Sequence, residues 1–168
     1  MSRAFVKETD GEQSGDQLPD LPISPHPNYV TASGLAKLEA RRAEFQKERA
    51  QLDDAGGDLT QASHIARLDQ EIRYYDARIA SAIPIDLKAV DPSQVSVGAR
   101  VTVQDAQGQT HHYRIVGEDE ADADAGLISW VSPLAKALMG ARVDDHVVWK
   151  RPRGDVELDI IEIGYPAE

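Results

Sequence analysis

The sequence predicts an α+β protein in which a long antiparallel helical hairpin precedes a small antiparallel sheet with one helix. Two observations lead to this prediction. Hydrophobic residues recur at alternating spacings of three and four up to Pro84, and they alternate with polar residues beyond Val95. We divide the 168 residues into a tail over residues 1–28, a hairpin over residues 29–90 and a C-terminal domain over residues 91–168.

The composition excludes several classes of protein. A net charge of −11 argues against a general affinity for nucleic acids or anionic membranes, which requires clustered basic residues. The chain contains no cysteine, so disulfides and thiolate metal sites are excluded. No apolar run approaches the ~20 residues that cross a membrane. We therefore expect a cytoplasmic protein with no membrane partner, which meets DNA or RNA only through another protein.

The tail is rich in proline. Four prolines lie between Pro19 and Pro27, and no hydrophobic periodicity accompanies them. We expect residues 1–28 to form a flexible extension.

Two helices follow the tail, each with a seam of mostly apolar residues typical of a coiled coil. The first seam contains Leu35, Leu38, Arg42, Phe45, Arg49 and Leu52, and the second contains Ile65, Leu68, Ile72, Tyr75, Ile79 and Ala82. Pro84 is expected to end the second helix. The stems of the two arginines are expected to lie along the seam with their charges outside it.

The turn between the helices, "QLDDAGGDLT", is strongly acidic. It contains Asp53, Asp54, Asp58 and a Gly-Gly pair, without a basic residue to neutralise them. A turn needs glycine and one capping Asp, so three carboxylates exceed what the geometry requires. The excess indicates a partner that prefers carboxylates, such as a metal ion.

The C-terminal part reads as strands with one short helix. The segment "RVTVQDAQGQTHHYRIVG" predicts a β-hairpin turning at "DAQGQ", and "GLISWVSP" predicts a third strand. The segment "LAKALMG" predicts a helix stopped by Gly140, with Ser132 as N-cap and Pro133 at its first position. A closing hairpin turns at residues 152–154.

Other polar clusters have simpler interpretations. The acidic segment Glu118–Asp124 lacks the glycine and the final Glu of a calcium loop, so we interpret it as a solvated loop. The only basic cluster, "KRPR", is expected at a hairpin surface, and contact with an acidic partner is the alternative.

These segments resemble a known family. The stretch "RIVGEDEADADAGLISWVSPLAKALMGARVDDHVVWKRPRGDVELDIIEIGY" is similar to the C-terminal, FKBP-like domain of the bacterial Gre (GreA/GreB) transcript-cleavage factors. The stretch "GDLTQASHIARLDQEIRYYDARI" resembles the second arm of their coiled coil. The resemblance covers residues 29–168 and leaves out the proline-rich tail.

The resemblance implies an elongation factor that is an accessory to RNA polymerase rather than an enzyme, acting as a monomer. The C-terminal domain would dock at the rim of the secondary channel through Ser132 and Pro133. The coiled coil would enter the channel, and its tip residues Asp58, Asp53, Asp54 and Gln61 would act at the polymerase active site. There they would help to hold a Mg²⁺ ion jointly with the polymerase, so that the 3′ end of backtracked RNA is cleaved.

Two departures from the family keep an alternative open. Where the family pairs an Asp with a Glu three residues later, this chain has Asp58 and Gln61. Each arm is also about seven residues shorter than is typical of the family, which at 1.5 Å per residue reduces its reach by roughly 10 Å. The alternative is a cleavage-inactive regulator that occupies the channel, similar to the anti-Gre homologues. A free-standing FKBP-like isomerase is a third, less favoured hypothesis.

Overall fold

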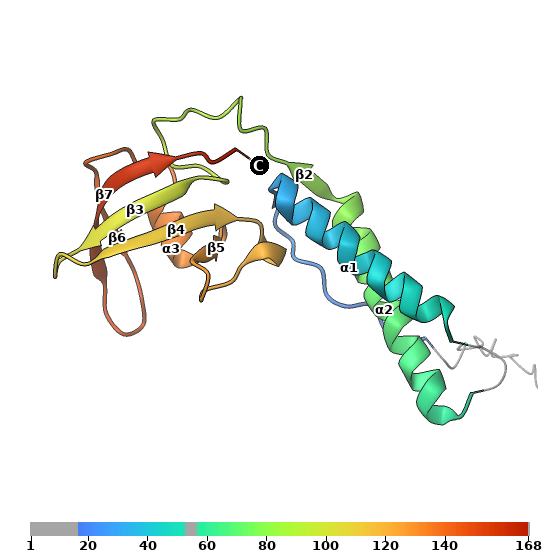
Figure 1. Cartoon of the computed structure of the whole chain (residues 1–168). Helices are drawn as coiled ribbons and strands as arrows, with labels where there is room; N and C mark the ends of the chain where they lie inside the picture. The colour runs from blue at the N-terminus through green and yellow to red at the C-terminus, as the bar shows by residue number, and fades with distance from the viewer. Residues whose placement is uncertain (1–16, 53–56, 168) are drawn as a thin grey trace, which may run out of the picture.

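The computed structural model describes residues 17–52 and 57–167, and it consists of a helical arm that projects from a curled sheet (Figure 1). The helices are α1 (Ala32–Ala50), α2 (Leu59–Ala80), α3 (Pro133–Leu138) and a 3₁₀ turn, η1 (Glu118–Glu120). The strands are β1 (Asn28–Val30), β2 (Ala82–Pro84), β3 (Arg100–Asp105), β4 (Thr110–Val116), β5 (Leu127–Ser129), β6 (His146–Trp149) and β7 (Val156–Gly164). The predicted α+β class is confirmed, whereas the boundaries at residues 28 and 90 stay predictions.

Helices α1 and α2 form the arm, and each begins at a side-chain cap. The hydroxyl of Thr31 accepts a hydrogen bond from the backbone N–H of Gly34 at 3.0 Å, and Asp58 caps α2 in the same way. The predicted end of α2 is wrong. The helix ends at Ala80, and Pro84 lies instead in β2, which pairs in parallel with β1.

The seam of the arm combines buried leucines with ion pairs. Leu38 and Leu68 are buried, at 4% and 3% exposure. The two arginines of the first seam turn their guanidinium groups to carboxylates of α2, at 3.2 Å for Arg42 and Asp76 and 2.8 Å for Arg49 and Asp69. These pairs are partly exposed, which confirms that the arginine charges lie at the edge of the seam.

The five-stranded sheet has the order β5-β4-β3-β7-β6. We call this sheet, with η1 and α3, the sheet domain. It was expected to be antiparallel throughout, and that expectation is wrong for β5, which pairs in parallel with β4. Tight turns join antiparallel strands, whereas the chain between β4 and β5 passes through η1 and a second turn before it returns in the original direction.

The core of the sheet domain lies between the sheet and α3. Its buried residues include Ala99, Val101, Val103, Ile115, Leu134, Ala135, Leu138, Leu158 and Ile160. Trp130 and Trp149 are only partly buried and pack against the margin of this core. The sheet domain therefore has its own hydrophobic core, separate from the seam of the arm.

Residues 17–27 of the tail have no helix or strand, but they contact both parts of the molecule. Arg73 of α2 donates to the carboxylate of Asp20 at 2.6 Å and to the carbonyl oxygen of Leu18 at 2.8 Å. Nearer the sheet domain, the Ser24 hydroxyl donates to Glu118 at 3.0 Å. Residues 1–16 lie outside the described residues, and the flexibility of the whole tail stays a prediction.

Within residues 17–52 and 57–167, no helix is both long and apolar enough to cross a membrane.

The buried seam predicts that replacing a leucine of α2 by alanine lowers the free energy of unfolding far more at Leu68 than at Leu59. Leu68→Ala should lower the free energy of unfolding by about 2–4 kcal/mol, because it leaves a cavity at a buried position. Leu59→Ala, at a side chain that is 88% exposed, should change it by less than about 0.5 kcal/mol. Urea denaturation followed by circular dichroism measures both, and equal losses would contradict the buried seam.

Candidate functional site

The first candidate site is the tip of the arm, around the first turn of α2. The Oδ1 atom of Asp58 accepts a hydrogen bond from the backbone N–H of Gln61 at 3.0 Å. Asp58 is therefore the N-cap and Gln61 the third residue of the helix, so that both side chains belong to one exposed turn. The second carboxylate oxygen of Asp58, Oδ2, is not engaged by this bond, so the capping role is compatible with binding a cation.

A shallow, open hollow lies beside Asp58. Its lining residues come from the last described turn after α1 and the first two turns of α2, and they are Leu52, Asp58, Thr60, Gln61, Ser63, His64 and Arg67. The imidazole of His64 lies 2.8 Å from the carboxylate of Glu48, and this contact joins the two helices close to the tip. The tip thus presents a carboxylate and an amide on a turn that is held to the opposite helix.

The other two predicted tip carboxylates, Asp53 and Asp54, lie outside the described residues. Among the residues that the structure does describe, no three His, Cys, Asp or Glu side chains are grouped closely enough to hold a metal ion.

The second candidate site is a groove on the sheet domain, with a volume of about 780 Å³. Its walls are largely apolar and include Tyr113, Leu127, Ile128, Pro133, Leu134 and Trp149. Ser132 and Pro133 lie in the wall at the start of α3, where the Ser132 hydroxyl accepts a hydrogen bond from the N–H of Ala135 at 3.2 Å. The predicted capping role of Ser132 is confirmed, and Pro133 is exposed at the first helical position.

The rim of the groove is basic. Lys150, Arg151 and Arg153 line it, and the guanidinium of Arg151 lies 4.9 Å from the centroid of the Trp149 ring. An apolar floor beside a positive rim suits a partner surface that carries apolar and acidic residues. This local charge is opposite to the net charge of −11 of the whole chain.

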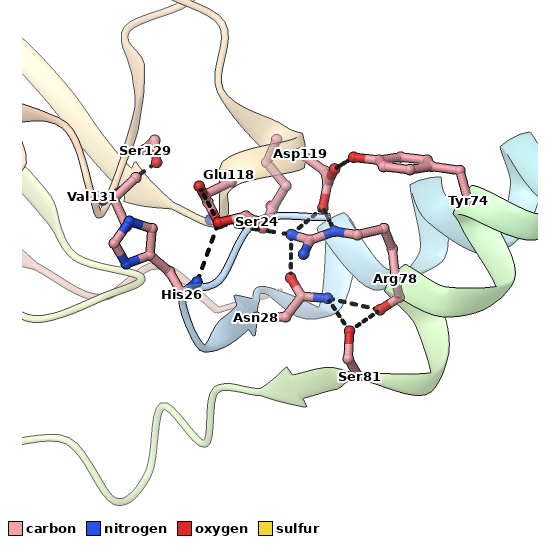
Figure 2. A network of polar contacts seen from close by, with 12 residues as sticks. Ser24, His26, Asn28, Tyr74, Arg78, Ser81, Glu118, Asp119, Ser129 and Val131 are labelled. Atoms are coloured by element: carbon pink, nitrogen blue, oxygen red, sulfur yellow. Dashed lines mark hydrogen bonds and ion pairs between the residues drawn. The ribbon is translucent and has the colours of Figure 1, made fainter. Parts of the chain in front are cut away.

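A third polar cluster, which we call the joint, connects the arm to the sheet domain and was not predicted (Figure 2). Arg78 of α2 is 1% exposed. Its Nε donates to Oδ2 of Asp119 at 2.7 Å, and one of its terminal nitrogens donates to Oδ1 of Asn28 at 2.8 Å. The same nitrogen lies 3.9 Å from Glu118. The interpretation of this acidic segment as a solvated loop is therefore wrong for its first residues.

The last carboxylate of η1 meets the other helix of the arm. Glu120 accepts hydrogen bonds from the backbone N–H groups of Thr31 and Gly117, each at 3.1 Å, and from the Thr31 hydroxyl. A Cβ atom at Gly34 would lie 2.0 Å from the Glu120 carboxyl carbon, so only glycine at that position allows this approach. The only signal in the sequence was the run of three acidic residues directly after a predicted strand.

The described residues thus form an arm with a carboxylate near its exposed end, and polar contacts join this arm to a domain with an apolar groove. Comparison with known proteins gives the family. Residues 90–165 match the sequence profile described as transcription elongation factor, GreA/GreB, C-term. The chain is 36% identical over 160 residues to the transcription elongation factor GreA of Legionella pneumophila, covering 87% of this chain and 100% of that protein. It is 33% identical over 148 residues to GreA of Maridesulfovibrio salexigens, covering 80% and 92%.

This chain belongs to the GreA/GreB family of transcription elongation factors. The resemblance of the sequence to this family is thereby confirmed, and with it the role of an elongation factor that is an accessory to transcription. Among solved structures, the chain is similar to GreA/GreB from Nitrosomonas europaea, at 18% identity and a TM-score of 0.41 over 82% of this chain and 99% of that one.

The comparison also bears on the length of the arms. The alignment with the Legionella protein runs over 160 residues and takes in all of that protein, but only 87% of the 168 residues of this chain, about 146. About 14 residues of the alignment therefore have no counterpart in this chain, and the shortening of each arm by one heptad stays a prediction.

The capping geometry predicts different effects of two substitutions at Asp58. Asp58→Ala should lower the free energy of unfolding by about 1 kcal/mol, because the N–H of Gln61 loses its acceptor. Asp58→Asn should change it by less than about 0.5 kcal/mol, because the amide oxygen can accept the same bond. Thermal denaturation measures both, and a large loss in Asp58→Asn would show that charge rather than capping dominates.

Proposed function

We propose that this elongation factor binds RNA polymerase at the rim of its secondary channel and promotes cleavage of the 3′ end of backtracked RNA. The observation that carries the proposal is the exposed carboxylate of Asp58 at the far end of a narrow arm. A carboxylate at such a place adds little to the fold beyond a helix cap, but it is well placed to act inside a partner.

The dimensions of the arm support this proposal. Helix α2 has 22 residues, which corresponds to a length of about 33 Å. Since the described part of the arm is narrower than the sheet domain, it can enter a passage that would exclude the sheet domain (Figure 1). The sheet domain then remains outside, where its groove is available for docking.

At the polymerase active site, Asp58 would contribute a carboxylate oxygen to a Mg²⁺ ion that the polymerase also holds. When bound, such an ion stabilises the attacking and leaving oxygens of phosphodiester hydrolysis. Gln61, on the same helical turn, offers a carbonyl oxygen without charge and so orients a water molecule less strongly than a Glu would. Asp53 and Asp54, which precede Asp58 in the sequence, would add further negative charge.

Docking is assigned to the groove of the sheet domain. Ser132 and Pro133 in its wall and the basic residues of its rim contact a segment of the polymerase that carries apolar and acidic side chains. The protein acts as a monomer in this arrangement, in the cytoplasm, and it contacts the RNA only near its 3′ end.

Substitutions at the tip test the cleavage mechanism. Asp58→Asn should reduce RNA cleavage in stalled, backtracked complexes to the rate without the factor, because it removes the charge that a hard cation prefers. Gln61→Glu should raise the rate by at least about tenfold, because it places a second carboxylate on the same turn. Release of the 3′ RNA fragment measures both rates.

Binding of the polymerase should remain unchanged in both variants. If the unsubstituted protein gives no cleavage at a saturating concentration and Gln61→Glu does not restore it, the cleavage mechanism is wrong. The chain would then be a regulator that occupies the channel.

Reversal of one charge tests the docking surface. Arg153→Glu at the rim should weaken polymerase binding by about 5- to 10-fold, or roughly 1 kcal/mol, and the difference should shrink as salt is added. Lys88→Glu makes the same change of charge at an exposed position outside the groove and should leave the affinity unaltered. Equal effects of the two variants would argue for a general electrostatic attraction instead of a defined groove.

A further inference from the structure

We propose that Arg78 and the carboxylates of η1 fix the angle at which the arm leaves the sheet domain, and that they thereby position the tip. Arg78 is a positioning residue on this view, because it acts on the reaction only through the placement of Asp58. The effect of Arg78 on the cleavage reaction rests on the proposed function. The fixed angle of the arm does not, since it is a property of the free protein.

The partners of Arg78 come from separate parts of the chain. Asp119 belongs to η1 of the sheet domain, and Asn28 belongs to β1 at the end of the tail. The Asn28 amide in turn donates to the backbone oxygen of Arg78 at 2.7 Å. Because a guanidinium donates in fixed directions within a plane, these bonds define the orientation of α2 as well as its distance from the domain. Arg78 is buried, so water and salt weaken them little.

A second residue of α2 strengthens this contact. The hydroxyl of Tyr74, four positions before Arg78, donates to Oδ1 of Asp119 at 2.8 Å (Figure 2). Partial burial, followed by the hydrogen bond to Asp119, raises the pKa of Tyr74 to about 12. The hydroxyl therefore stays protonated and donating at neutral pH. Asp119 thus holds two successive turns of α2, which opposes rotation of the helix about its own axis.

Helix α1 is held by the neighbouring residue of η1. Glu120 directly follows Asp119 and accepts hydrogen bonds from Thr31, the N-cap of α1. Close to this point, Gly117 lies against β1, where an added Cβ atom would be 2.3 Å from the backbone oxygen of Tyr29. Consecutive residues of one short 3₁₀ turn therefore hold both helices of the arm. The arm cannot pivot on the domain without breaking bonds to at least one of them.

The length of the arm makes the angle important. A rotation of about 5° at the joint would move the end of a helix about 33 Å long by roughly 3 Å. A misplacement of about 1 Å at a reacting centre can already cost about a hundredfold in rate. A tip that acts at a distant active site therefore needs a stiff joint, and the ion pairs and hydrogen bonds around the buried Arg78 supply it.

The angle can be measured directly because the chain contains no cysteine. Spin labels are attached to cysteines introduced at two exposed positions, Gln46→Cys on the arm and Gln107→Cys in the turn between β3 and β4. Pulsed electron paramagnetic resonance then gives the distribution of distances between the labels. Asp119→Asn should broaden this distribution at least about twofold, because it removes the charge that orients Arg78.

Asp76→Asn is the matched control. It removes the same charge from another Arg–Asp pair of the arm, Arg42–Asp76, which lies wholly within the hairpin and does not reach the sheet domain. The distance distribution of this variant should equal that of the labelled protein without further changes. Tyr74→Phe is a milder second variant that removes one bond to Asp119, and it keeps the test decisive if Asp119→Asn does not fold.

The two proposals fail in different ways. In saturating amounts, Asp119→Asn should lower the cleavage rate about tenfold or more, while the concentration for half-maximal effect changes less than about twofold. An unchanged distance distribution in folded Asp119→Asn and in Tyr74→Phe overturns the fixed angle, whatever the cleavage assay shows. Broadening in a protein that never stimulates cleavage supports the fixed angle and overturns the proposed function.

Discussion

The buried guanidinium of Arg78 is the point on which the architecture depends, because it joins two parts that have separate hydrophobic interiors. The seam of the arm and the core of the sheet domain do not merge. Their connection is largely polar and consists of one arginine, the carboxylates of η1 and an asparagine of β1, and an apolar contact between Tyr29 and Trp130 lies beside it. A buried charge that loses its partner is strongly destabilising, so such a cluster specifies one arrangement more sharply than an apolar contact of similar size.

At the opposite end of the arm, one side chain serves the fold and the proposed chemistry. Asp58 caps α2 with one carboxylate oxygen, and the proposed function assigns the other oxygen to a cation. The cap holds the carboxylate in place on the helix, which reduces the conformational freedom that binding would otherwise have to remove. The fold at the tip is thus simple, and in the proposed function its chemistry depends on a metal ion that the partner supplies.

The sequence was sufficient for the features that depend on local periodicity. The seam through Phe45 and Tyr75, the capping of α3 by Ser132 and the turn after β3 all follow from spacings of a few residues. The joint was missed because it combines residues 28, 78 and 119, whose separation in the chain leaves no local pattern. The direction of β5 was missed for a related reason, since a three-residue strand carries no mark of its orientation. Membership of the family was predicted from long ordered motifs, and neither local periodicity nor contacts between distant residues contributed to it.

The tail changes the profile of the arm along its length. Residues 18–20 lie against Gln70 and Arg73, near the middle of α2, so among the described residues the arm has three segments in cross-section there. In any passage that admits the arm, this thickening acts as a shoulder and limits how deeply the arm can slide in. The shoulder is held by exposed hydrogen bonds and one exposed ion pair, which water replaces at little cost. Contact with the wall of such a passage can therefore displace the tail from α2.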